Sequence, residues 1–426
     1  MFRRLFKSGW WWPLRGSKPY LGAIAAAGLG AFPADPPDGA LYLRQPDRIP
    51  FLFNGANWHT LRNADAGCPG RLSTDSADAF PTTDQTGKTQ VHLVPVGRGG
   101  AVELYDAASE DWVPRALDEA VSLTLPSTTY RILDVFLAWV GGRLVLEFEN
   151  WNQTSAALTN VTAASPCVVT SASHGQSDGT LIGINNVTGT VGTNTNNGVN
   201  GRVWTAAGAA ANTFQLQGSD GTLLAYAGGG NFYSVPNTRI TSLTKKNGRW
   251  TKASDPTRLY VGSVMNHATA GQTEDSVSRR LVWNNYNRRL VPLRVTETED
   301  YNYSAAAYRP LRNIIANRVE FIQGLSEDMV SASAMISAYH DTAGFTATSS
   351  GIGLKRTNAS DAQQMGAYVE VANATVLTSA YEGHPGLGYS YLQWIEIATA
   401  SGITSWLGDS TVPSMFQSSL LARVWC

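Results

Sequence analysis

Carboxylates spaced two residues apart are the side chains best placed for acid–base chemistry in this sequence of 426 residues. Two such pairs occur, Glu147 with Glu149 and Glu297 with Glu299. In a strand, positions i and i+2 lie on one face about 7 Å apart, a separation that suits inverting glycoside hydrolysis. The solvent-facing side of an antiparallel strand gives the same spacing and is the preferred interpretation. The sequence therefore favours a protein that is not an enzyme, with a polysaccharide-degrading enzyme as an alternative.

Metal, thiol and nucleotide chemistry find little support in the sequence. The histidines have no partner at i+2 or i+4, the spacings of a local zinc site. Cys68, Cys167 and Cys426 are far apart and odd in number, which fits neither a disulfide framework nor a paired metal motif. The end of a phosphate-binding loop at 86–89 lacks its first glycine, because Thr82 occupies that position. We expect no cofactor, no metal and a solvated loop at 86–89.

Aromatic residues gather near the C-terminus and offer a possible glycan-binding site. Tyr389 and Tyr391 alternate along one strand, and Trp394 follows them. Exposed rings in such a row would stack on sugar rings, whereas buried rings would belong to the core or to a contact between subunits. Large aromatic side chains are mostly buried, so packing is the preferred interpretation and glycan binding the alternative.

Composition and patterning predict the elements that must position these residues. Hydrophobic residues make up 43% of the chain, which excludes global disorder, and the formal net charge of −1 offers no long-range field for nucleic acid. Short alternating segments separated by Gly, Asp and Pro predict antiparallel strands from 91 to 151 and again from 238 onward. One short helix is expected after Ser276, with Val277 and Leu281 on one face.

The tract 157–232 differs from its flanks because it nearly lacks charge. Its only Asp, Glu, Lys or Arg residues are Asp178, Arg202 and Asp220, and it is rich in Thr, Asn and Gly. Short apolar runs between Gly and Asn turns predict a small antiparallel β module. The texture of the preceding strands resumes after the tract, so we expect an inserted β domain at 157–232 within a discontinuous body formed by 91–156 plus 233–426.

The first residues have a composition of their own. Residues 1–39 begin with a basic stretch that contains Trp10–Trp12, followed by an apolar run at Leu21–Phe32 that is too short to cross a bilayer as a helix. We expect an extended arm that anchors the protein to a partner; a signal peptide or membrane segment is the alternative. Residues 40–90 are expected to form a small hairpin neck and a polar linker. The expected anchoring residues are Trp10, Trp11, Trp12, Leu21, Ile24 and Phe32.

Several segments together resemble a module of tailed-bacteriophage virion fibres and spikes. In that family an LYDG…W hairpin and a YDVF strand precede a YLG…DS…KRFVWNYYNR segment. The matching positions here are Leu104–Asp106 with Trp112, Leu133–Phe136, Tyr260–Gly262, Asp275–Ser276 and Arg280–Arg288, with Leu281 in place of the usual Phe. The resemblance covers 91–156 and 233–426, roughly 60% of the chain.

Two shorter resemblances accompany it. The tract 157–232 resembles a small phage β module known by its likeness to a domain of ubiquitin-activating enzymes, on the stretches SPCVVTSASHG, NGRVWT and NTFQLQGSDGT. It implies no ubiquitin chemistry, because the adenylation machinery is absent. Leu41–Tyr42 with Phe53–Gly55 and Trp58 resembles the small hairpins of fibre shafts.

These observations lead to one prediction for fold and function. The fold is mostly β, with an antiparallel β-sandwich body of jelly-roll type, an inserted small β domain and the N-terminal arm. The resemblance implies a virion structural protein on the particle surface, a tail or head fibre or spike, that forms a homo-oligomer of three copies. Its expected partners are other virion proteins (capsid, portal or tail) through the arm and a host-surface glycan, but not nucleic acid. A polysaccharide-degrading spike and a secreted bacterial surface lectin are the alternatives.

Overall fold

The computed structural model describes residues 41–44, 49–53, 58–60, 67–96, 100–191, 198–341, 346–369, 371, 373–409 and 417–426. The chain divides into two units, 1–67 and 68–426, which are considered separately. In the first unit, β1 (Leu41–Arg44), β2 (Ile49–Phe53) and β3 (Trp58–Thr60) form a three-stranded antiparallel sheet. This sheet lies at the start of 40–90, where the sequence predicts a small hairpin neck.

The described part of the chain is almost entirely β, as the sequence predicts. It contains no α-helix, only a single 3₁₀ turn, η1 (Leu311–Asn313). None of its helical residues form a segment long and apolar enough to cross a membrane. Pairing is antiparallel throughout the sheets except where β23 runs parallel to β28.

The base of the second unit is a group of three small sheets around one core. Its six-stranded sheet has the order β11-β10-β21-β20-β19, with β24 also paired to β21. The apolar core includes Leu72, Leu93, Val135 and Val261. The strands of the base are β4 (Gly70–Ser73), β6 (Gln90–Pro95), β7 (Gly100–Asp106), β8 (Asp111–Leu117), β9 (Val121–Thr124), β10 (Ile132–Val140), β11 (Arg143–Asn150), β19 (Leu243–Lys246), β20 (Arg249–Lys252), β21 (Asp255–Met265) and β24 (Val282–Asn284).

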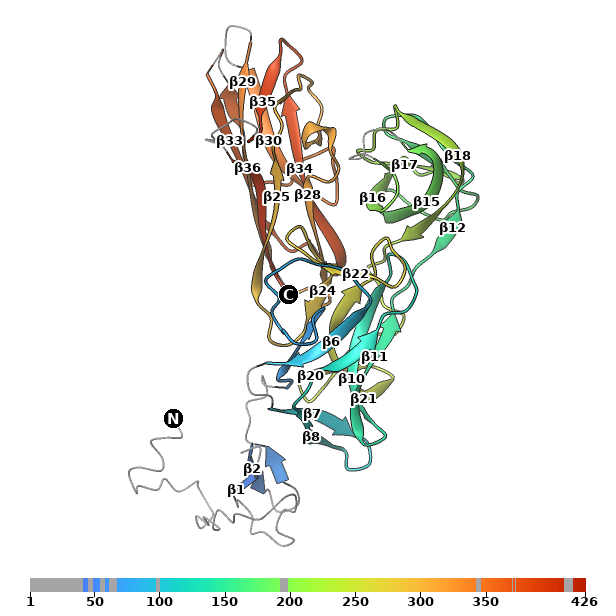
Figure 1. The fold of residues 1–426 in the computed structure, drawn as a ribbon, viewed down its shortest axis with the longest axis vertical. Coiled ribbons are helices and arrows are strands. Elements are labelled where there is room, and N and C mark those ends of the chain that lie inside the picture. Colours follow the sequence, from blue (N-terminus) through green and yellow to red (C-terminus); the bar gives the residue numbers. More distant parts are fainter. Residues whose placement is uncertain are drawn as a thin grey trace, which may run out of the picture. The chain divides into compact units, whose positions relative to one another are not determined.

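The inserted module has a sheet and a core of its own. Its seven strands, in the order β12-β18-β15-β16-β17-β14-β13, pair only with one another and curl around buried residues such as Trp204 and Phe214 (Figure 1). They extend from Ser155 to Ser234, two residues beyond the predicted tract at each end. The strands are β12 (Ser155–Ala157), β13 (Asn160–Val161), β14 (Val168–Thr170), β15 (Leu181–Val191), β16 (Arg202–Ala207), β17 (Thr213–Leu216) and β18 (Leu224–Ser234).

The chain enters and leaves this module at adjacent points of the base. The amide of Asn152 donates to the carbonyl of Thr238 at 3.1 Å, and Trp151 forms a β-bridge with Arg239. The strands on both sides, β11 and β19, belong to the six-stranded sheet of the base. The insertion inferred from the change in composition therefore follows the strand pairing, while independent folding of the module stays a prediction.

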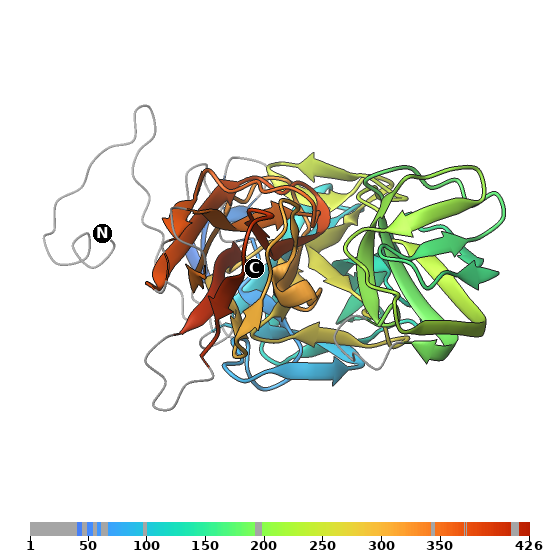
Figure 2. The same ribbon diagram turned by 90° about the horizontal axis from the view of Figure 1, so that it is seen from above.

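The C-terminal part is a sandwich of two sheets. An eight-stranded sheet contains β5 (Gln85–Lys88), β22 (Thr273–Asp275), β23 (Arg279–Arg280), β27 (Arg309–Pro310), β28 (Arg318–Gln323), β30 (Thr346–Leu354), β32 (Ala367–Val369) and β34 (Gly388–Ala398). A seven-stranded sheet contains β25 (Leu290–Glu297), β26 (Tyr301–Asn302), β29 (Val330–His340), β31 (Gln364–Met365), β33 (Thr375–Gly383), β35 (Thr404–Leu407) and β36 (Ser418–Trp425). The strands that follow residue 290 are orange and red in Figure 2. The two sheets enclose a core with Phe321, Ile336, Trp394 and Leu420. The predicted sandwich is confirmed, although the buried apolar residues of the body form three clusters rather than one.

The polar stretch before residue 90 is not a linker, which corrects the sequence-based expectation for its described part. β4 pairs with β6 in the base, and β5 pairs with β22 in the sandwich. Arg71 is buried and its guanidinium donates to the carbonyls of Ala79 at 3.0 Å and Cys426 at 2.6 Å. Few apolar residues, such as Leu72, anchor this segment, and buried hydrogen bonds supply the rest of its order, so its composition resembled that of a loop.

The short helix expected after Ser276 is also absent. The segment is a hairpin of β22 and β23, leading into β24, in which Arg280 pairs with Asp275 at 2.8 Å. Leu281 is buried, but Val277 is 41% exposed, so the two residues do not share a face. The ion pair across the two strands thus favours a hairpin here, although Ser276 is a typical N-cap residue of a helix.

Candidate functional site

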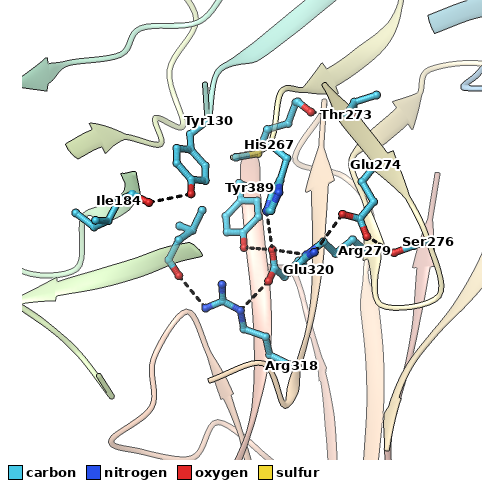
Figure 3. A network of polar contacts seen from close by, with 12 residues as sticks. Tyr130, Ile184, His267, Thr273, Glu274, Ser276, Arg279, Arg318, Glu320 and Tyr389 are labelled. Carbon is cyan, nitrogen blue, oxygen red and sulfur yellow. Dashed lines mark hydrogen bonds and ion pairs between the residues drawn. The ribbon is translucent and has the colours of Figure 1, made fainter. Parts of the chain in front are cut away.

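A buried polar network centred on Glu320 joins the base, the module and the sandwich (Figure 3). Glu320 lies on β28, whose six residues are all buried. Its Oε1 accepts a hydrogen bond from Arg318 Nε at 2.9 Å, and its Oε2 accepts one from the Tyr389 hydroxyl at 2.7 Å. Arg279 Nε lies 3.3 Å and His267 Nε2 3.9 Å from Oε2. One carboxylate thus holds groups from the base and from both edges of β28. We call these five residues the junction network.

Further hydrogen bonds attach the module to this network. Arg318 Nη1 donates to the carbonyl of Val203 on β16 at 2.8 Å, and the hydroxyls of Tyr391 and Thr205 are 2.6 Å apart. The guanidinium of Arg318 also lies over the ring of Tyr391, 4.6 Å from its centroid, where the ring face attracts a cation. The module is therefore held to the sandwich by polar contacts with defined directions, beside an apolar cluster in which Leu181 and Val203 of the module meet Ile322 of the sandwich.

The base contacts the module through the ring of Tyr130. Its hydroxyl donates to the carbonyl of Ile184 on β15 at 3.1 Å. A Cβ placed on Gly183 would lie 2.2 Å from this ring, so only glycine permits the approach.

Burial and charge set the protonation states within the junction network. Burial alone would raise the pKa of Glu320, but Arg279 and Arg318 outweigh it and hold that pKa well below its usual range. Burial, with Arg279 acting in the same direction, lowers the pKa of His267 to about 4. At neutral pH the network is therefore an anionic carboxylate, two guanidinium groups and a neutral imidazole. Arg318 and Glu320 are almost fully buried, and Arg279 is engaged by both Glu320 and Glu274, so the network can fix the parts of the fold relative to one another.

The motifs that carry the family resemblance meet in a second buried cluster, within the base. Asp134 of the LDVF segment lies on β10, where Oδ2 is 2.5 Å from Arg239 Nε and Oδ1 accepts from the Ser263 hydroxyl at 2.8 Å. The guanidinium of Arg239 lies over the ring of Trp151, 4.5 Å from its centroid. Tyr260 completes the cluster with its hydroxyl 2.6 Å from that of Ser263.

Asparagines of the VWNNYNR segment replace missing strand partners of β4. Asn284 Oδ1 accepts from the amide of Leu72 at 2.6 Å, and Asn284 Nδ2 donates to the carbonyl of the same residue at 3.2 Å. Asn287 Nδ2 donates to the carbonyl of Gly70 at 2.8 Å. Because a buried backbone without partners is costly, these side chains explain why asparagine stands at both positions. The resembling motifs therefore maintain a fold rather than form a reaction centre.

The aromatic row at the C-terminus is buried, which corrects its interpretation as an exposed glycan platform. Tyr389, Tyr391 and Trp394 are at most 2% exposed. The two tyrosines face the junction, whereas Trp394 faces the sandwich core and donates to the Ser350 hydroxyl at 2.7 Å. Both faces of β34 are covered, so these rings do not stack on a sugar at the surface. The preferred alternative, core packing, agrees with the structure.

Both carboxylates of the first pair are engaged with cations. On β11, Glu147 Oε2 lies 2.9 Å from Arg258 Nε, and Glu149 Oε2 lies 2.5 Å from Lys252 Nζ. Both carboxylates are half-buried, and their partners lie on β21 and β20 of the same six-stranded sheet.

The second pair does not share one environment. Glu297 is buried, with Oε1 3.0 Å from Arg312 Nη1 and Oε2 accepting from Asn317 Nδ2 at 2.8 Å. Glu299 is exposed. The geometry brings neither pair to a substrate-sized cleft with a free acid and a free base.

Other nucleophiles are equally constrained within the described residues. His92 Nδ1 lies 2.7 Å from the Ser122 hydroxyl, but the two residues are register partners on β6 and β9, so strand pairing accounts for the contact. Burial raises the pKa of Cys68 to about 12 and of Cys426 to about 11, and Cys167 is also buried with a raised pKa. No group of three or more His, Cys, Asp or Glu residues there could hold a metal ion.

The anchoring prediction cannot be compared with the structure. The residues Trp10, Trp11, Trp12, Leu21, Ile24 and Phe32 lie outside the described residues.

Comparisons with known proteins leave the family open. No family model and no curated protein matches the sequence. Among solved structures, a chain in the structure of the infectious bursal disease virus Gx strain is 8% identical to this one. The match covers 82% of this chain and 79% of that chain, with a TM-score of 0.21. The Gt strain is 12% identical over 82% and 80%, with a TM-score of 0.22. The Cry4Aa toxin of Bacillus thuringiensis is 7% identical over 81% and 50%, with a TM-score of 0.18. Such TM-scores mean that the backbones do not share one arrangement, so these likenesses carry no argument about function.

The junction network was not foreseen from the sequence. Its one local signal is the segment RVEFIQ, where Arg318 and Glu320 alternate with apolar Val319 and Phe321. That alternation is typical of a strand with one solvated face, so it placed the two charges in water. A buried Arg-x-Glu pair of this kind is recognisable only once the module is known to cover the strand.

Proposed function

We propose that this chain is a non-enzymatic structural protein of a bacteriophage particle, a fibre or spike whose arm at 1–39 anchors it to other virion proteins. The head, made of the base, the module and the sandwich, is displayed on the particle surface for contact with the host. Host-surface glycan remains the proposed class of receptor, recognised by a surface other than the buried row at Tyr389–Trp394. The protein acts as a homo-oligomer, and the resemblance implies three copies.

One observation carries this proposal. Three of the stretches quoted for the resemblance to virion fibres and spikes are distant in sequence but lie side by side on β10, β21 and β24 of one sheet: Leu133–Phe136, Tyr260–Gly262 and Val282–Asn284. Their polar side chains are used by the fold itself, as with Asp134 and Asn284. This convergence supports a shared structural module over a chance match of short motifs.

The engagement of the candidate acids supports a role without catalysis. Glu147, Glu149 and Glu297 each have a cationic partner at 3.0 Å or less. A glycosidase needs one carboxyl group to donate a proton and a second to act as base or nucleophile at the scissile bond. Release of oligosaccharide from host capsule or lipopolysaccharide by the purified protein would refute this part of the proposal.

Particle incorporation tests the anchoring role. Phage carrying a deletion of residues 2–39 are purified, and the protein content of the particles is measured by mass spectrometry. We expect the truncated protein to accumulate in the lysate as soluble folded protein and to be missing from particles. A matched control with Glu147→Gln, an exposed change in the head, retains normal incorporation. Particles that contain the truncated protein at the normal level would exclude the arm as anchor.

A further inference from the structure

The outer face of the seven-stranded sheet is a groove with a floor of small side chains. Across this face the strands lie in the order β25-β36-β29-β33-β31. Residues that alternate inward, such as Ala332 and Leu420, fill the sandwich core. Their outward neighbours Ser331, Ser333 and Ala380 line a groove with a volume of about 970 Å³. This face is therefore indented along β29 rather than filled by its own side chains.

Large apolar side chains surround the floor of the groove. Met335 on β29 and Leu421 on β36 are 43% and 45% exposed, and Val376 on β33 is 52% exposed. Leu290 and Trp425, opposite each other on β25 and β36, add two more exposed apolar side chains at one end. Apolar residues gathered on one face of a sheet are typical of a surface that is covered by a partner.

Two opposite charges flank the groove at the same level. Arg423 on β36 and Glu382 on β33 are both register partners of Ser331 on β29, one on each side. They are about 10 Å apart, twice the spacing of neighbouring strands. Both are exposed, and neither forms an ion pair with another described residue of the chain. A partner that carries a negative charge opposite Arg423 and a positive charge opposite Glu382 would pair with both.

A second copy of the same face presents its charges in this arrangement. When two such faces are stacked about a two-fold axis parallel to β29, each β36 lies across from the partner's β33 at an unchanged level along the strands. Arg423 then faces the partner's Glu382, and the reciprocal contact forms on the other side of the axis. An isologous interface of this kind repeats every favourable contact twice.

The same two-fold rotation also matches the side chains that lie two residues further along β29, at Ser333. Leu421 and Ala380 are the two register partners of Ser333, so each Leu421 faces the partner's Ala380, a large side chain against a small one. Ser333 lies on the axis and faces its own copy. We infer that two copies of this protein pair through the outer face of the seven-stranded sheet, about a two-fold axis along β29.

The size of the face indicates how tight this pairing is. Four strands at about 4.8 Å and about eight residues at 3.4 Å give a projected area of roughly 500 Å² per copy. A standard stable interface buries about 800 Å² per partner, so pairing through this face alone is weak and depends on protein concentration. An even number of copies is expected, and six copies would combine this contact with a three-fold one. The inference does not depend on a virion role.

Charge exchange at the two flanking residues tests the inference on the full chain by sedimentation. Glu382→Arg or Arg423→Glu places two like charges opposite each other in every pair, so each single variant is expected to pair at least about tenfold more weakly than the wild type. The double variant restores both contacts in exchanged positions and should pair as the wild type does. An equal mixture of the two single variants should also pair, because each then meets its complement.

Cross-linking tests the position of the axis. Ser333→Cys should give linked dimers with a bismaleimide that spans about 10 Å, the usual distance between packed sheets. Ser109→Cys, an exposed position in the turn between β7 and β8, is the matched control and should give none. The inference is overturned by a monomer at all concentrations, by an odd-numbered assembly, by a double variant that fails to pair, or by equal cross-linking at both positions. Circular dichroism verifies that each variant is folded.

Discussion

Replacing Glu320 by Gln should destabilise the whole second unit, because it leaves the buried guanidinium of Arg318 without its anion. The Arg318 side chain is 1% exposed, whereas Arg279 is 25% exposed and keeps Glu274 Oε2 at 3.1 Å. Breaking a buried ion pair from one side costs about 3 to 5 kcal/mol. The substitution keeps the size of the side chain, so cavity formation adds little. Glu147→Gln is the matched control, since that carboxylate is 40% exposed and its loss costs at most about 1 kcal/mol.

Urea unfolding followed by tryptophan fluorescence measures both variants, and acidification provides a second readout. The pKa of Glu320 is lowered in the folded protein. Its contribution to stability is therefore present above the unfolded pKa of about 4.3 and is lost as the pH falls through the lower folded value. We expect the difference between wild type and Glu320→Gln to be large at pH 7 and to shrink below about pH 4. A loss of less than about 1 kcal/mol at pH 7, equal to that of Glu147→Gln, would refute the assignment of Glu320 as the centre of the network.

Two further predictions concern the sandwich and the module. Burial raises the pKa of Glu396 to about 7 despite Arg309 Nε at 2.7 Å. A raised folded pKa gives stability that is complete below the unfolded value of about 4.3 and is lost as the pH rises through 7, a change of order 3 kcal/mol. Glu396→Gln should remove this decline in urea titrations between pH 4 and 8; an unchanged slope would contradict the prediction. Replacing residues 154–236 by a short Gly-Ser link should leave a cooperatively melting β protein, because Asn152 and Thr238 are already hydrogen-bonded. Its melting temperature should fall, since Tyr391 loses its module partner, and loss of the cooperative transition would show that the body needs the module.

Local sequence signals predicted the strands whose faces differ in solvation. Residues 330–340 alternate apolar and polar, and they form β29 with one face in the core and one outward. Gly141 and Gly142 occupy the turn between β10 and β11, and both residues have the positive φ that such a turn requires. These elements are determined by neighbours in sequence, so a pattern of period two was sufficient.

The errors occur where distant segments decide the environment. β34 alternates as though one face were solvated, but the module covers the side that carries Tyr389 and Tyr391. The segment around Arg71 has few apolar residues, and carbonyls from the distant Ala79 and Cys426 help to order it. The junction network needs base, module and sandwich at once, and no window of sequence contains all three.

The polar character of the junction network determines how the head would respond to force. Apolar surfaces slide past one another gradually, whereas hydrogen bonds and close ion pairs weaken steeply once their atoms separate by about an ångström. The link from Arg318 to Val203 and that from Tyr391 to Thr205 lie side by side, so a load applied to the module is carried by both together. We therefore expect the contact between module and sandwich to resist small forces with little extension. Above a threshold force, both links should break together rather than lengthen gradually.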